Sequence, residues 1–173
     1  MHNPGLFLFS SITYEKINSS FDNSFDMTNM AFFGENLILD KICEKDICVG
    51  DILKIGQAKV QITQPRQPCW KLSANSLKNS MTKFIFETGL TGFYAKVLKE
   101  GQISQNDDVV LEQRTNPNLT IEKLNQIIVE PKIDINLTKE ALACEDLGHQ
   151  FKNSLTKRYE LGDEDNQFSF YHT

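Results

Sequence analysis

The sequence is poor in several residues and patterns that mark common classes of protein. It contains only 3 histidines, at positions 2, 149 and 172, which argues against a histidine-based metal site or catalytic triad. No run approaches the roughly 20 apolar residues that span a bilayer, and the start lacks the charged-then-apolar order of a secretory signal. A net charge of −5 argues against general nucleic-acid binding. We therefore expect a cytoplasmic protein with no nucleic-acid or membrane partner.

Cysteine is also scarce. The 4 cysteines lie at positions 43, 48, 69 and 144, a spacing that matches neither a paired zinc site nor a dense disulfide framework. We expect free thiols in a reducing compartment. With 173 residues and 40% hydrophobic content, the chain is long enough for one core, or for one core with a small appendage.

What the sequence does contain is a cysteine inside a stiff and basic loop, in Gln64-Pro65-Arg66-Gln67-Pro68-Cys69-Trp70-Lys71. Each proline fixes its own φ and keeps the residue before it extended. Arg66 precedes Cys69 and Lys71 follows it. If both cations turn inward, they favour the thiolate that a nucleophile or a soft-metal ligand requires. The alternative is a buried cysteine in a rigid turn whose cations point to water.

A second candidate site follows an aromatic pair, in Phe32-Phe33-Gly34-Glu35-Asn36-Leu37. Glycine permits a positive φ or a close backbone approach, which would present the Glu35 carboxylate and the Asn36 amide to a ligand. An ordinary turn with solvated polar side chains is the alternative.

The residue pattern before position 114 predicts mainly β structure. Apolar or alternating runs broken by turn residues favour short strands at residues 6–9, 47–49, 52–55, 58–63 and 92–98. A further strand pair is expected at residues 102–103 and 109–112, and helical spacing indicates helices at residues 70–77 and 81–88. Short strands with tight glycine turns favour a compact β-barrel or sandwich.

The composition changes at Arg114-Thr115-Asn116-Pro117-Asn118, a polar, turn-forming stretch that we interpret as a domain boundary. Apolar spacing after it predicts helices within residues 121–128, 137–142 and 147–155, the first capped by Thr120. We therefore expect a mainly β domain over residues 1–114, a small three-helix domain over residues 118–160 and a tail over residues 161–173.

The sequence carries, in order, the segments Phe33-Gly34-Glu35-Asn36-Leu37, Cys48-Val49-Gly50-Asp51, the proline-flanked residues 64–72, and Thr91-Gly92-Phe93-Tyr94. Together they resemble the MOSC family, named for the C-terminal domain of molybdenum cofactor sulfurase. The helical part resembles the three-helix domain of its stand-alone bacterial branch. The resemblance implies a MOSC-type β-barrel that binds molybdenum cofactor. It also implies reduction of N-hydroxylated compounds, including hydroxylaminopurines, with electrons from a partner redox protein.

The resemblance also implies roles for individual residues. Cys69 would be the catalytic residue and the metal ligand, and Arg66 and Lys71 would bind the anionic cofactor or tune the thiolate. The motifs place Glu35, Asn36 and Tyr94 at the same pocket. Family descriptions also link the domain to pyridoxal phosphate, although no lysine here stands out as a Schiff-base former. The alternative to catalysis is a non-catalytic module that carries the cofactor or a sulfur group on Cys69.

One part of the family pattern has no counterpart here, because a longer N-terminal portion with further barrel strands precedes the run that begins at Leu6. We expect either a start at an internal methionine or a barrel that has lost part of its sheet. A missing strand leaves an exposed sheet edge, at which pairing with another chain is expected, a homodimer included.

Overall fold

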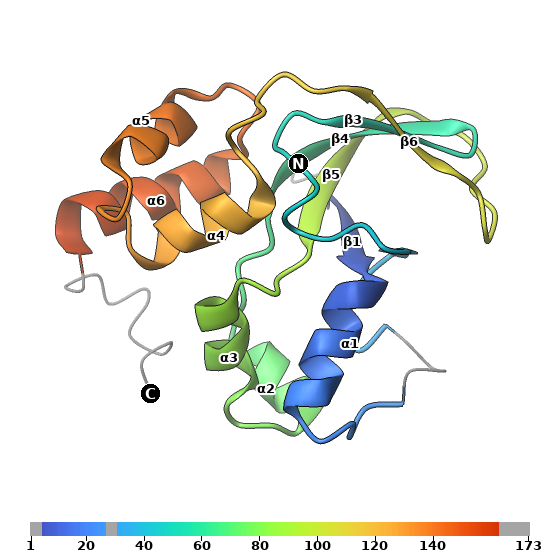
Figure 1. Cartoon of the computed structure of the whole chain (residues 1–173), viewed down its shortest axis with the longest axis horizontal. Coiled ribbons are helices and arrows are strands. Elements are labelled where there is room, and N and C mark those ends of the chain that lie inside the picture. The colour runs from blue at the N-terminus through green and yellow to red at the C-terminus, as the bar shows by residue number, and fades with distance from the viewer. Residues whose placement is uncertain (1–4, 27–30, 163–173) are drawn as a thin grey trace.

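The computed structural model describes residues 5–26 and 31–162, and in these ranges it contains a mixed sheet of six strands. The strand order is β2-β1-β5-β4-β3-β6, and the sheet curls into a half-barrel (Figure 1). The strands are β1 (Leu6–Ser10), β2 (Leu37–Leu39), β3 (Ile52–Ile55), β4 (Ala58–Pro65), β5 (Phe93–Lys99) and β6 (Val109–Gln113). Helices follow the sheet in the chain, which confirms the predicted fold class.

Strand β1 is continuously apolar because it lies inside the sheet, between β2 and β5. Its alternate residues face opposite sides, and Phe7, Leu8 and Phe9 are all buried. Helix α1 (Ser11–Ser20) begins directly after the strand, because the side chain of Ser10 caps it by accepting the backbone N–H of Ile12.

Strand β4 alternates between buried and partly exposed residues, as predicted for a half-buried strand. It pairs antiparallel with β3 on one side and with β5 on the other. It extends beyond the predicted range to Pro65, where it still pairs with Phe93 of β5. The sheet therefore reaches into the loop predicted to carry the chemistry.

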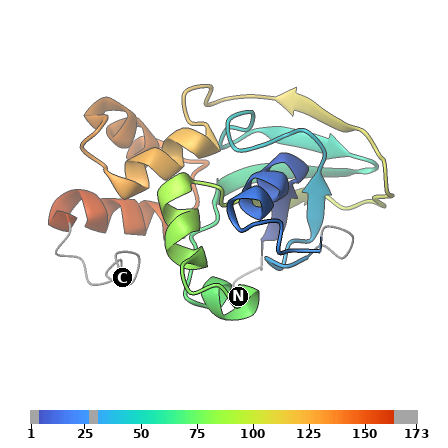
Figure 2. The ribbon, with the colours of Figure 1, turned by 60° about the horizontal axis from the view of Figure 1, so that its bottom comes forward.

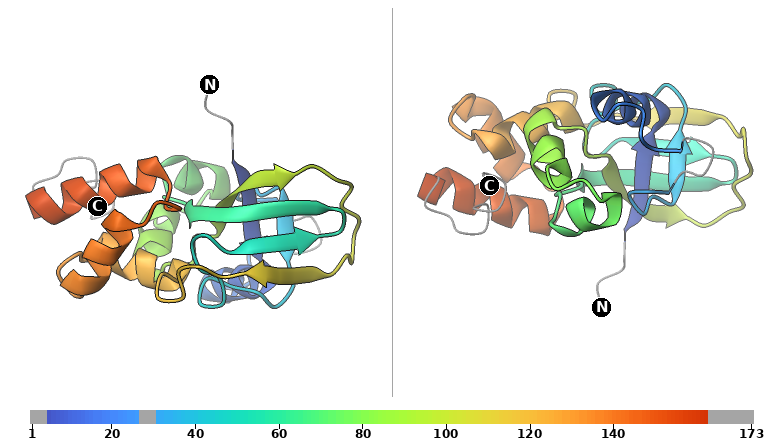
Figure 3. Two further views of the ribbon diagram at one scale, coloured as in Figure 1. Left: turned by 90° about the horizontal axis from the view of Figure 1, so that it is seen from above. Right: turned by 90° about the horizontal axis from the view of Figure 1, so that it is seen from below.

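Helices α4 (Ile121–Val129), α5 (Ile135–Ala143) and α6 (His149–Leu161) confirm the helices predicted after position 118. As predicted, Thr120 caps α4, since its side chain accepts the backbone N–H of Lys123. The three helices lie together beyond one end of the strands (Figure 3). Helices α2 (Lys71–Ser76) and α3 (Met81–Thr88) confirm two further predicted helices, and α3 lies between the C-terminal helices and α1 (Figure 2).

The buried apolar residues form two clusters. The larger joins one face of the sheet to the C-terminal helices and includes Leu8, Leu53, Ile62, Leu124 and Phe151. The smaller joins the other face of β1 to α1, α2 and α3 and includes Phe7, Phe9, Ile17, Leu72 and Ile85. The sheet and the C-terminal helices therefore share one core.

Two expected strands are not strands. Residues 47–49 make only a single bridge, between Cys48 and Thr120, because the Cys48 N–H donates to the carboxylate of Asp51 instead of to a neighbouring strand. Residues 102–103 do not pair with β6, which pairs with β3. The carbonyl of Gln102 accepts the N–H of Gln57 at the β3–β4 turn, so the chain wraps around that hairpin before β6 begins.

Several expectations concern residues outside the described ranges, namely positions 2 and 172 and residues 163–173 of the tail. Among the residues that are described, no helix combines the length and the apolar character needed to cross a membrane.

Candidate functional site

The loop predicted to carry the chemistry connects β4 to α2 through residues 66–70. Both of its flanking prolines, Pro65 and Pro68, are buried. The backbone N–H of Arg66 donates a hydrogen bond to the carbonyl oxygen of Gly92 at 3.1 Å, which continues the contact between β4 and β5. The sheet therefore holds the beginning of the loop.

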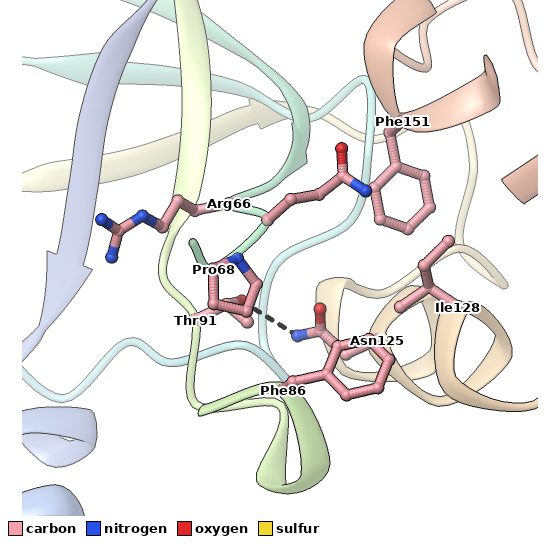
Figure 4. A pocket seen from close by; sticks show the side chains of 8 residues that line it. Arg66, Pro68, Phe86, Thr91, Asn125, Ile128 and Phe151 are labelled. Carbon is pink, nitrogen blue, oxygen red and sulfur yellow. Dashed lines mark hydrogen bonds between the residues drawn. The ribbon is translucent and has the colours of Figure 1, made fainter. Parts of the chain in front are cut away.

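The C-terminal helices hold the same loop from another side. The hydroxyl of Ser154 on α6 lies 3.3 Å from the side-chain oxygen of Gln67. Pro68 lines a small pocket together with Thr91 and Asn125, which are hydrogen-bonded to each other (Figure 4). The cavity measures about 10 Å³, which is room for about one water molecule. It is therefore a gap in the packing and not a cofactor site.

Cys69 differs from the other cysteines in its exposure. Cys43, Cys48 and Cys144 are buried, whereas Cys69 is partly exposed. All four cysteines are free thiols, as expected from their spacing in the sequence. The carbonyl oxygen of Cys69 accepts a hydrogen bond from the hydroxyl of Thr82 at 2.9 Å. Solvent therefore reaches the residue while α3 holds its backbone.

Three of the predicted site residues contact Phe7 on β1, two of them at its aromatic ring and one at its backbone. The guanidinium carbon of Arg66 lies 5.2 Å from the ring centroid, within cation–π distance. Tyr94, opposite Phe7 on β5, places its own ring centroid 5.2 Å away. The side-chain oxygen of Asn36 accepts the N–H of Phe7, and the Asn36 N–H donates to the Phe7 carbonyl, both at 2.8 Å. The structure thus brings three separate motifs together.

Glu35 organises the segment between α1 and β2. Its carboxylate accepts hydrogen bonds from the hydroxyl of Tyr14 at 2.5 Å and from the N–H of Ala31 at 2.6 Å. Burial and the neighbouring Glu35 carboxylate raise the pKa of Tyr14 well above its usual range. Gly34 has a φ of +80°, the conformation for which glycine was expected. A role for Glu35 toward a ligand stays a prediction.

The two cations of the loop differ in exposure, because Lys71 is exposed and Arg66 is only partly exposed. Lys71 begins α2 with an exposed side chain, and the Arg66 guanidinium points away from Pro68 and Asn125 (Figure 4). The charged residues in the sequence around the loop are all of one sign. Residues 52–86 include lysines and an arginine but no aspartate or glutamate. In a chain with a net charge of −5, this stretch is expected to carry positive potential.

A larger hollow of about 760 Å³ lies elsewhere, between β2 and the segment that leads into β6. Its lining includes Asp40, Asp107 and Asp108 and none of the predicted site residues. Because these acidic groups repel an anion, the hollow suits an anionic cofactor poorly. Within residues 5–26 and 31–162, no three histidine, cysteine or acidic side chains gather as a metal site.

The sequence analysis did not identify Phe7 or Glu44 as candidate site residues. Phe7 is one apolar residue in an apolar strand, and only the β1–β5 register reveals that it faces Tyr94. Glu44 is 5% exposed. Burial raises its pKa, and hydrogen bonds from Thr13 and Gly92 act in the opposite direction. Its charged neighbours in the sequence resemble a solvated turn, so the local pattern contains no sign of this burial.

A comparison with protein families matches residues 5–110 to the MOSC domain. The chain belongs to the MOSC domain family. The matched range includes β1, the segment around Asn36, the Cys69 loop and Tyr94. The family suggested by the sequence motifs is therefore confirmed.

Two bacterial MOSC relatives have sequences similar to this chain over most of its length. It is 32% identical to the uncharacterized protein YflK of Bacillus subtilis over 128 residues, which are 74% of this chain and 58% of YflK. It is 28% identical to YiiM of Escherichia coli over 126 residues, which are 73% of this chain and 56% of YiiM. The chain thus spans little more than half the length of either relative.

A fungal relative matches this chain over only a small part of its own length. A reductase of Gibberella moniliformis is 29% identical over 116 residues, which are 66% of this chain but only 21% of that protein.

Solved structures of two YiiM proteins have the same fold as this chain. YiiM from Geobacillus stearothermophilus superposes with a TM-score of 0.80 at 31% identity, covering 88% of this chain and 77% of that one. YiiM from Escherichia coli gives a TM-score of 0.82 at 25% identity, covering 95% and 81%. Both similarities support the stand-alone bacterial branch with its C-terminal helices.

Proposed function

We propose that this protein is a molybdenum-cofactor-dependent reductase of N-hydroxylated compounds, hydroxylaminopurines among them, and that the Cys69 thiolate is a ligand of the molybdenum. The observation that supports this best is the partial exposure of Cys69 on a held loop, whereas the other cysteines are buried. A thiolate is a soft ligand and suits such a metal. The relative named a reductase supports redox activity in the family.

Reduction of an N-hydroxylated compound breaks the N–O bond, leaves an amine and releases the oxygen as water. It consumes a pair of electrons and a pair of protons, which in this proposal come from an electron-donor protein and from solvent. When bound, the cofactor supplies the redox chemistry. The chain supplies the anchoring thiol, the orientation of the cofactor and the charges around it.

The residues around Phe7 support the binding of an anionic group. A phosphate is bound by cations and by backbone N–H groups, and the acid-free stretch 52–86 contains Arg66 and Lys71. Phe7 is 4% exposed, and its ring supports the Arg66 guanidinium before any ligand arrives. A cation that is already ordered loses less conformational entropy on binding.

The ligand assignment is tested by the molybdenum content of the full chain, purified from a host that makes the cofactor. The wild type is expected to retain the metal and Cys69→Ser to lose it. Cys144→Ser, which changes a buried cysteine, is the matched control and is expected to retain the metal. Equal metal in the wild type and Cys69→Ser would reject Cys69 as the ligand, and no metal in the wild type would reject the function.

The activity is tested with an N-hydroxylated purine and a reduced viologen dye as electron source, followed by the appearance of the amine. Turnover by the wild type and its loss in Cys69→Ser are expected. Metal-loaded protein without turnover would instead favour a non-catalytic cofactor carrier.

A further inference from the structure

Glu44 is a buried carboxylate without a part in the proposed chemistry. It lies between β2 and β3 and is 5% exposed. Burying a carboxylate costs free energy unless hydrogen bonds offset the loss of water. Here the N–H of Gly92 donates to one carboxylate oxygen at 2.9 Å, and the hydroxyl of Thr13 donates to the other at 2.7 Å.

Gly92 connects this carboxylate to the loop of Cys69. Its N–H contacts Glu44, and its carbonyl oxygen accepts the N–H of Arg66 at 3.1 Å. Gly92 has a φ of +68°, and a Cβ there would meet the ring of Phe9 at 2.6 Å, so the residue has little room to move. Glu44 therefore holds the amide on one side of Gly92, and Arg66, the first residue of the loop, is bonded to the carbonyl on its other side, so a shift of Gly92 shifts the start of the loop.

The same turn is held from a second side by Asn125 of α4. Its side-chain amide donates to the carbonyl of Gly89 at 2.8 Å and to the hydroxyl of Thr91 at 3.0 Å. The hydroxyl of Thr91 in turn donates to the carbonyl of Gly92 at 2.8 Å. The turn before β5 is thus fixed between two buried polar side chains from opposite parts of the chain.

We propose that Glu44 is a positioning residue for Cys69, because it fixes the Gly92 peptide and so sets the course of the loop that presents the thiol. The inference rests on the proposed function in one respect, namely that the thiol of Cys69 binds the molybdenum. The position of the loop is measurable without any cofactor.

The experiment measures the rate at which iodoacetamide alkylates each cysteine, followed by peptide mass spectrometry. The full chain is purified from a host that does not make molybdenum cofactor. Cys43, Cys48 and Cys144 are buried and report unfolding in the same sample, and Cys69→Ser supplies the background.

Glu44→Ala removes both acceptors and is expected to raise the alkylation rate of Cys69 about tenfold, while the buried cysteines stay unlabelled. Glu44→Gln keeps an acceptor for the Gly92 N–H and is expected to label near the wild-type rate. Thr138→Val is the control for lost stability alone. It removes a buried hydrogen bond to the Pro131 carbonyl, and the rate at Cys69 is expected to stay unchanged.

Equal rates at Cys69 in the wild type and Glu44→Ala would overturn the proposal. An equal rise in Thr138→Val would overturn it as well, and so would a rise shared by the buried cysteines, since that reports unfolding. Because alkylation needs no cofactor, a failure of the molybdenum experiment would reject the proposed function and leave this result standing.

Discussion

The hydroxyl of Thr82 donates a hydrogen bond to the carbonyl oxygen of Cys69 at 2.9 Å. The same hydroxyl oxygen accepts the N–H of Ser73 at 3.3 Å, and the Thr82 N–H donates to the Ser73 hydroxyl at 3.0 Å. Helix α3 is thereby joined to α2 and also to the Cys69 loop, which precedes α2 in the chain. The position of the cysteine depends on a later helix as well as on the two prolines.

Thr82→Val keeps the shape of the side chain but removes its hydroxyl. The Cys69 carbonyl then keeps only the N–H of Leu72, and the Ser73 N–H loses its acceptor. We expect the free energy of unfolding to fall by about 1–2 kcal/mol and Cys69 to be alkylated about fivefold faster. Thr82→Ser keeps the hydroxyl and is expected to label near the wild-type rate. Equal alkylation of the two variants would contradict the role of this hydrogen bond.

Gly92 and Gly34 both have positive φ angles, but their surroundings differ. A Cβ at Gly92 would meet the Leu8 carbonyl oxygen at 2.7 Å, whereas nothing lies within 4 Å of one at Gly34. We therefore expect Gly92→Ala to lower the free energy of unfolding by about 3 kcal/mol or more, from strain plus overpacking. Gly34→Ala should cost about 1 kcal/mol, from strain alone. Urea unfolding measures both, and similar losses would contradict the tight packing around Gly92.

The ion pair of Arg114 with Asp51 is partly buried and bidentate. The Nε and Nη2 atoms of Arg114 lie 2.9 and 2.7 Å from the two carboxylate oxygens, and Asp51 is fully buried. Arg114→Met would leave a buried carboxylate without a cation, and we expect a loss of about 3 kcal/mol in urea unfolding. The more exposed pair of Lys59 with Glu112, whose side chains are 39% and 32% exposed, is the comparison, and Lys59→Met should cost less than about 1 kcal/mol. Equal losses in the two variants would mean that the burial of Asp51 does not increase the contribution of Arg114 to the free energy of unfolding.

The elements predicted correctly are those whose cause is local. Strand β4 shows its alternation in the sequence because one face is buried along its whole length. Helix α4 has its cap, Thr120, and its apolar side within a dozen residues. In both cases the residues that determine the element lie inside or next to it.

The wrong strand assignments have a different origin. A strand requires a partner, and the partner of β6 is β3, more than fifty residues earlier in the chain. Likewise, the apolar run around Cys48 is buried without pairing as a strand, because Asp51 takes its N–H. An apolar pattern indicates burial but does not identify the hydrogen-bond partner.

The same distinction applies to the site. The Cys69 loop was recognisable because its prolines and cations are adjacent to the thiol in the sequence. The gathering of Asn36, Arg66 and Tyr94 around Phe7 depends on strand register, which the sequence does not display. Glu44 became visible only through its burial against Gly92.

The pH dependence of stability offers an independent test of that burial. Burial raises the pKa of Glu44 above the ordinary value near 4.5, and the unfolded chain keeps the ordinary value. Such a group contributes stability below its unfolded pKa and loses it as the pH rises through its folded pKa. The nearby charge of Lys16 acts against the rise in the pKa of Glu44 but is smaller in effect than the burial.

Glu44→Gln cannot titrate, so its free energy of unfolding should rise relative to that of the wild type as the pH increases from about 4 to about 8. The difference should level off once the wild-type carboxyl is ionised in the folded chain. Urea unfolding of both proteins at intervals across this range measures it. A difference that stays constant would mean that Glu44 titrates alike in the folded and unfolded chains, and the hydrogen bonds from Thr13 and Gly92 would then fully offset its burial.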